Sequence, residues 1–79
     1  MNITDIKMRR KENHGRLKAV VSLTIDGNYV INDLFVIQGD KRLYVQFPRT
    51  KDGRSFFVPT NDQARDLLEN QIIEAYQTA

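Results

Sequence analysis

Residues 17 to 37 carry the pattern that most restricts the fold of this chain. Apolar side chains occupy every second position at its start, namely Leu17, Ala19, Val21, Leu23 and Ile25. A period of two places such side chains on one face of a β-strand and does not match the spacing of a helix. Asp26-Gly27 follows, a dipeptide that favours the positive backbone angles of a tight hairpin turn. The sequence therefore predicts a long antiparallel hairpin.

The returning strand of this hairpin contains four consecutive apolar residues, Leu34 to Ile37. Such a run cannot face one side only, so we expect both faces of that strand to be covered. The register stays open, because a two-residue loop places Asn32 opposite Val21 and a three-residue loop places Asp33 there. Either register turns a polar residue toward the apolar face, and a β-bulge at Asn32-Asp33 would resolve the conflict.

Alternating apolar residues and turn signals continue along the rest of the chain. They predict five strands and one helix, with the strands at about 2–10, 16–26, 28–38, 42–47 and 54–58 and the helix at about 61–77. Thr60 is expected to cap the helix, with Gln63 reaching back as in a capping box. Helical spacing predicts a buried stripe of Ala64, Leu67, Leu68, Ile72, Ala75 and Tyr76, with Ile73 outside it. This order predicts a single α+β domain over residues 1–79, an antiparallel sheet with one helix packed on it.

The composition excludes several kinds of site. The 79 residues include no cysteine and a single histidine, His14, so disulfides, thiolate or histidine-rich metal sites and cysteine nucleophiles are impossible. His14 lies beside a glycine in a predicted turn, and turn chemistry also explains Asp26, Asp40 and Asp52. No apolar run is long enough for a membrane span, and no signal-peptide core is present. We therefore expect a cytoplasmic protein without enzymatic activity, cofactor, metal, membrane contact or small-molecule substrate.

A domain of this size without a disulfide often needs a partner to bury enough apolar surface. A second copy is the simplest partner, because one self-complementary patch then suffices. The sequence thus predicts a homodimer formed through the sheet. Its expected interface residues are Leu34, Phe35, Val36 and Ile37.

The charge is unevenly distributed along the chain. Residues 1–60 carry a net charge of +5 and residues 61–79 carry −3, which gives the total of +2. The candidate nucleic-acid-binding residues form two basic clusters, Arg9, Arg10 and Lys11 in the first and Arg49, Lys51 and Arg54 in the second. Cations on loops can reach phosphates, although ordinary solvated surface explains the two clusters equally well.

Two further features bear on how such a surface would read nucleic acid. The acidic helix would meet phosphates at a cost, so a recognition helix in the major groove is not expected. Tyr44, flanked by Arg42 and Gln46 on one strand face, could stack on an unpaired base. It could equally lie under the helix or in a dimer contact.

Several motifs in order resemble one protein family. They are Thr4–Arg10, Gly15–Ala19, Val30–Gly39, Leu43–Pro48, Asp52-Gly53 and Pro59–Asn61. Over nearly its whole length the chain resembles the SpoVG family, the stage V sporulation protein G (septation protein) group. It departs from the family at Ser55-Phe56-Phe57-Val58, where acidic and histidine residues are usual, and its tail is shorter than in many members.

The resemblance implies a dimeric sheet-plus-helix domain that binds DNA or RNA and regulates gene expression in bacteria, with ties to septation and sporulation. The alternative is a protein-interaction module that acts in septum formation without binding nucleic acid directly.

Overall fold

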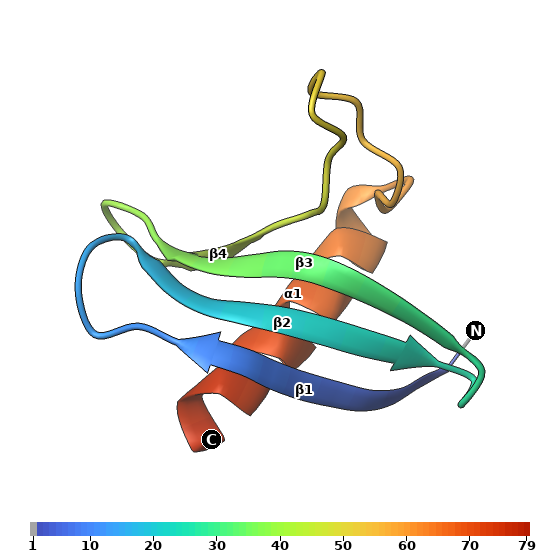
Figure 1. The fold of residues 1–79 in the computed structure, drawn as a ribbon, viewed down its shortest axis with the longest axis horizontal. Helices are drawn as coiled ribbons and strands as arrows, with labels where there is room; N and C mark the ends of the chain where they lie inside the picture. The colour runs from blue at the N-terminus through green and yellow to red at the C-terminus, as the bar shows by residue number, and fades with distance from the viewer. Residues whose placement is uncertain (1) are drawn as a thin grey trace.

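A computed structural model describes residues 2–79 of the chain. Within these residues it contains four strands and one helix: β1 (Ile3–Lys11), β2 (Leu17–Ile25), β3 (Tyr29–Gln38), β4 (Leu43–Gln46) and α1 (Asp62–Thr78). The strands form one antiparallel sheet in chain order, and α1 lies across one of its faces (Figure 1). The predicted α+β fold is confirmed, with four strands where five were expected.

The strand predicted at 54–58 is wrong. Residues 48–60, which we call the arm, instead form a loop that projects away from the sheet before the chain enters α1 (Figure 1). A single antiparallel bridge, between Arg49 and Ser55, holds the two sides of the arm together at its base. Pro48 has no amide hydrogen to donate, so the chain leaving β4 cannot continue a ladder there.

The hairpin of β2 and β3 has the predicted turn and the predicted bulge. Asp26 and Gly27 both have positive φ angles, of 53° and 71°. Further from the turn the register shifts by one residue, so Val21 pairs with Leu34 rather than with a polar residue. The extra residue lies at Asn32-Asp33, where Asp33 has a φ of 65°. The bulge thus keeps the apolar face continuous across the hairpin.

The core fills the space between the sheet and α1. Its residues are Ala19, Val21, Leu23, Leu34, Val36, Val45, Phe47, Leu68 and Ile72, all less than 9% exposed. The alternation predicted for β2 holds from Ala19 onward. Leu17 departs from it, because it pairs with Ile37 beyond a second bulge and lies outside the core cluster.

The run from Leu34 to Ile37 divides between the two faces of the sheet. Leu34 and Val36 are fully buried against the helix side, so they are unavailable to a partner as the structure stands. Phe35 and Ile37 alternate with them and are half-buried on the opposite face. We call that face the open face, because no helix covers it (Figure 1).

The open face carries an apolar patch at its centre. Val20 pairs with Phe35, and Tyr44 pairs with Ile37, so these four side chains neighbour one another across three strands. We call Val20, Phe35 and Ile37 the open-face patch, and Tyr44, on the outer strand β4, lies at its edge. These side chains all lie outside the core cluster, so the described chain leaves part of their apolar surface exposed.

Helix α1 differs from the sequence expectation in its cap and in its buried stripe. The side chain of Asn61, not of Thr60, caps it by accepting a hydrogen bond of 2.8 Å from the amide of Ala64. Leu68 and Ile72 are buried as predicted, but Leu67 is 64% exposed. Ile73, expected outside the stripe, packs against the core. The helix is therefore rotated slightly relative to the predicted stripe.

Candidate nucleic-acid interface

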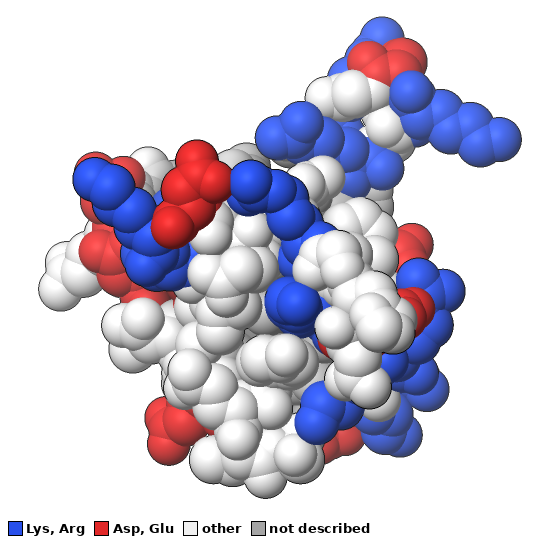
Figure 2. All heavy atoms as spheres, turned by 90° about the vertical axis from the view of Figure 1, so that its left-hand side faces the viewer, with Lys and Arg blue, Asp and Glu red and all other residues white. Residues whose placement is uncertain are grey.

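The arm carries the second predicted basic cluster. Arg49, Lys51 and Arg54 are all exposed, and Figure 2 shows lysine and arginine side chains gathered on this projection. Arg54 lies with its Nε 3.3 Å from Oδ2 of Asp52, the only acidic residue of the arm. Within residues 2–79, no salt bridge holds Arg49 or Lys51. The arm therefore presents an excess of positive charge to solvent.

The arm has internal hydrogen bonds that fix its turn. The amide of Thr50 donates to the carbonyl of Arg54 at 2.8 Å, and the amide of Gly53 donates to the carbonyl of Thr50 at 3.0 Å. The Thr50 hydroxyl also bonds to the carboxylate of Asp52. Gly53 has a φ of 85°, which a residue with a side chain rarely adopts. These contacts hold the three cations on one short, ordered turn.

The first predicted cluster does not stay together. Arg9 lies on the open face, where its Nε donates to Oγ of Ser22 at 3.1 Å, and that hydroxyl donates to Oδ1 of Asn32 at 2.8 Å. Arg10 pairs with Glu12, with its Nε 2.7 Å from Oε1. These two arginines sit on β1, an outer strand of the sheet.

Lys11 turns to the other face and contacts α1. Its Nζ donates to the carbonyl oxygen of Ala79 at 3.1 Å and lies 5.6 Å from the centre of the Tyr76 ring. A cation at the carbonyl end of a helix is favourable, because the helix dipole is negative there. Lys11 therefore stabilises the packing of α1 and does not join the cations of the open face.

The two clusters lie at opposite edges of the sheet. The first is on β1, and the second follows β4, while β2 and β3 separate these outer strands. Three strand spacings correspond to about 14 Å. A ligand that contacts both clusters must therefore cross the sheet.

The sequence interpretation missed one cation, Arg65, because it lies in the acidic helix. Its Cζ is 5.3 Å from the centre of the Phe47 ring, and Phe47 in turn packs edge to face on Phe57 with centroids 6.0 Å apart. Arg65 and Arg49 line the same pocket at the base of the arm. The only sequence signal for Arg65 was its place one turn into the helix that follows the arm.

One acidic residue of α1, Glu69, contacts strand β4 of the sheet. Glu69 is buried, where its Oε2 accepts a hydrogen bond of 2.9 Å from the amide of Val45 and its Oε1 accepts one of 3.0 Å from Arg42. An outer strand leaves amide and carbonyl groups without partners, and Glu69 satisfies one of them on β4. Glu69 thus has a structural contact that ties α1 to the sheet.

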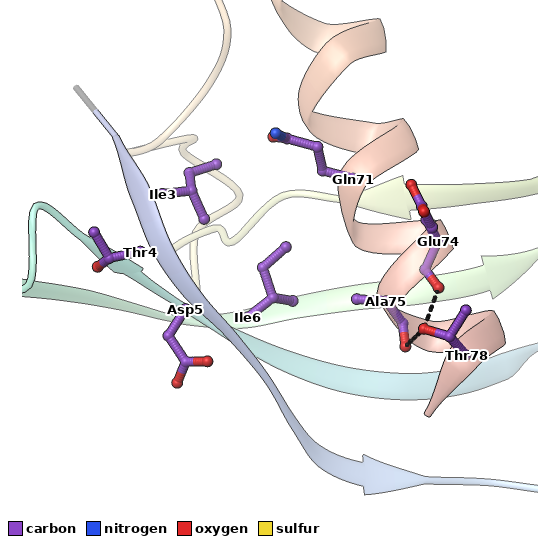
Figure 3. Close-up of a pocket in the computed structure, with 8 residues that line it drawn as sticks. All are labelled: Ile3, Thr4, Asp5, Ile6, Gln71, Glu74, Ala75 and Thr78. Atoms are coloured by element: carbon purple, nitrogen blue, oxygen red, sulfur yellow. Dashed lines mark hydrogen bonds between the residues drawn. The ribbon is translucent and has the colours of Figure 1, made fainter.

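A groove of about 450 Å³ lies between β1 and α1 (Figure 3). Ile3 and Ile6 point toward the helix, whereas Asp5 points away from it, so Asp5 and Glu74 do not converge. The hydroxyl of Thr78 bonds to carbonyls of its own helix.

Among the residues that the structure describes, no three histidine or carboxylate side chains come together as metal ligands. In the same part of the chain, no helix has the length and apolar character needed to cross a membrane.

Comparison with known proteins identifies the family. Residues 1–78 match the family model described as SpoVG. A protein of Lachnospira eligens named "Putative septation protein SpoVG" is 43% identical over 100% of this chain and 94% of its own length. One of Agathobacter rectalis with the same name is 44% identical, over 99% of this chain and 94% of its own length. "Putative septation protein SpoVG 1" of Listeria monocytogenes is 43% identical over 100% of this chain and 81% of its own. The chain belongs to the SpoVG family.

Proposed function

We propose that this protein is a small regulatory protein that binds DNA or RNA, chiefly through phosphates, and acts as a homodimer in septation or sporulation. The septation part of the proposal rests on the names of its relatives. The nucleic-acid part rests on one observation, the exposed arm with Arg49, Lys51 and Arg54. Two of these three cations have no carboxylate partner within residues 2–79.

The physical basis of binding is the release of counterions from the phosphate backbone. Each phosphate neutralised by a lysine or arginine releases condensed cations, which supplies affinity that depends on salt and little on sequence. Exposed cations on a short turn can approach phosphates closely, and the arm stands clear of the sheet. Modest sequence preference is expected, because phosphate contacts position a protein without reading bases.

The homodimer proposal rests on the open-face patch. Val20, Phe35 and Ile37 form an apolar surface that a second copy can cover with the same residues, and Tyr44 on the outer strand β4 lies at its edge. Leu34 and Val36, which the sequence interpretation also assigned to the interface, face the core. A dimer presents each arm twice, and two linked weak sites bind more tightly than one without new contacts.

The proposal is tested by fluorescence anisotropy with labelled random 20-mers of single-stranded DNA, duplex DNA and RNA. We expect binding at 50 mM salt that weakens about 20- to 40-fold at 200 mM when the three cations of one arm contact phosphates, and more steeply when both arms of the dimer bind the same strand. Light scattering on the same samples is expected to give twice the chain mass. Absence of binding to all three probes at 50 mM salt would contradict the nucleic-acid part, and a monomer at micromolar concentration would contradict the dimer.

A second candidate function, a protein-interaction module, is favoured by a different surface. Phe56, Val58 and Leu67 are 63%, 55% and 64% exposed. Val58 and Leu67 line a groove of about 710 Å³ between the arm, the start of β1 and α1. Exposed apolar side chains that gather in this way often mark contact surfaces. An intact dimer that binds none of the three probes would favour this function over the first.

A further inference from the structure

A pocket of about 260 Å³ lies at the base of the arm, between β4, the arm and α1. Its lining includes Tyr44, Gln46, Phe47, Arg49, Ser55 and Arg65. These residues come from three separate parts of the chain, and the fold alone brings them together. Pockets for drug-sized molecules usually measure about 300 Å³ or more, so this one suits a smaller group, such as one base with the adjoining part of its backbone.

The surroundings of the pocket hold the side chain of Arg65 and the backbone of Arg49. The guanidinium of Arg65 lies over the ring of Phe47, with Cζ 5.3 Å from its centre. The backbone of Arg49 forms the bridge with Ser55 that closes the arm. Neither arginine has a salt bridge within the described residues. Both charges are therefore available to an anion, and the guanidinium of Arg65, already held against the Phe47 ring, loses little conformational freedom when the anion binds.

Tyr44 supplies an aromatic ring at the same place. A Cβ atom at Gly39 would lie 3.3 Å from two carbons of this ring, so the ring sits directly beside the glycine backbone. Tyr44 is 37% exposed and also lines the pocket. The ring is thus held in position but remains accessible to a ligand. Aromatic rings at such sites stack on bases of any sequence.

We propose that this pocket binds one unpaired nucleotide of a single strand, with its base against Tyr44 and its phosphate between Arg49 and Arg65. The inference rests on the proposed function and adds to it a ligand class, single-stranded rather than duplex nucleic acid. A duplex keeps its bases stacked on one another, so only its phosphates could use this site. The amide of Gln46 and the hydroxyl of Ser55 provide hydrogen-bonding groups for the base or sugar.

The test compares Tyr44→Leu with Tyr44→Phe, because leucine keeps apolar contact with the sheet but removes the ring. The probes are a labelled ten-residue thymidine strand, the same strand with all bases removed, and a duplex of equal length. We expect Tyr44→Leu to bind the thymidine strand about 5- to 150-fold more weakly, the range for one stacked base. Tyr44→Phe is expected to retain the wild-type affinity. Binding of the abasic strand and of the duplex is expected to change less than twofold.

A second readout does not depend on the fold of the Tyr44 variants. Arg65→Gln is expected to flatten the slope of log affinity against log salt by about 0.7 on the thymidine strand. In the wild type, a single 2-aminopurine in that strand should lose fluorescence on binding as it stacks on the ring.

The possible outcomes separate the inference from the function on which it rests. Equal affinity of Tyr44→Leu and wild type for the thymidine strand, with wild-type binding intact, would overturn the pocket and leave the proposed function standing. An Arg65→Gln protein with an unchanged salt slope would also overturn it. If the wild type binds none of the probes, the proposed function itself has failed.

Discussion

Replacing Leu34 with alanine is expected to lower the free energy of unfolding by about 2–5 kcal/mol. Leu34 is fully buried between the sheet and α1, so the shorter side chain leaves a cavity that its neighbours fill only in part. In a domain of this size the loss corresponds to a fall in melting temperature of about 10–30 °C. Urea denaturation followed by circular dichroism measures it.

Val30→Ala is the matched control in the same strand. Val30 is 54% exposed and lies outside the core cluster, so its loss is expected to change the free energy of unfolding by about 0.5 kcal/mol or less. Comparable losses for the two variants would contradict the assignment of Leu34 to the core. They would also restore Leu34 as a candidate for the dimer interface.

Replacing Arg49, Lys51 and Arg54 together with alanine is expected to weaken nucleic-acid binding about tenfold or more at 50 mM salt. Each lost phosphate contact flattens the slope of log affinity against log salt by about 0.9 on duplex DNA and about 0.7 on single strands. The three substitutions should therefore flatten it by about 2 to 3. None of these three side chains belongs to the core cluster, so the variant is expected to fold normally.

The control for this variant removes the same charge elsewhere. Lys7, Lys18 and Lys41 lie on β1, on β2 and in the turn before β4, away from the arm. Their joint replacement with alanine changes the net charge equally, and we expect it to flatten the slope by less than about 1. Equal effects of the two triple variants would mean that net charge, not the arm, governs binding.

The hairpin could be predicted from sequence because its signals are local. The alternation in β2, the Asp26-Gly27 turn and the polar pair at Asn32-Asp33 each constrain neighbouring residues. They left the register open but pointed to a bulge at Asn32-Asp33 as a way to keep the apolar face continuous, and the structure has this bulge. The fifth strand could not be assessed in this way. Residues 54–58 have strand-like composition, but a strand also needs a partner, and Arg49 supplies only one bridge.

The residue that caps α1 and the face on which Lys11 lies both depend on backbone geometry, which residue types alone do not specify. Thr60 and Asn61 are both good caps, and the extended backbone of Asn61, with φ −153° and ψ 166°, makes it the cap. Lys11 faces the helix because a bulge at Arg9 shifts the register of β1 against β2. Counting alternate residues fails beyond such a bulge, since every later side chain changes face.

The sequence predicted only part of the candidate site. Arg49, Lys51 and Arg54 are close in the chain, so their shared turn keeps them together in space. Arg65 and Tyr44 reach the same place only through the packing of α1 on the sheet and through the position of the arm. Contacts of that kind depend on the tertiary structure, and no short motif encodes them.

Mapping the bound surface by NMR shows directly whether the arm and the pocket at its base contact nucleic acid. Nitrogen-15-labelled protein would be titrated with an unlabelled ten-residue thymidine strand, and the shift of each backbone amide followed. We expect the largest shifts on residues 44–58 and on Arg65, with small shifts along the groove between β1 and α1. Shifts concentrated in that groove, or on the exposed acidic side of α1, would contradict this expectation.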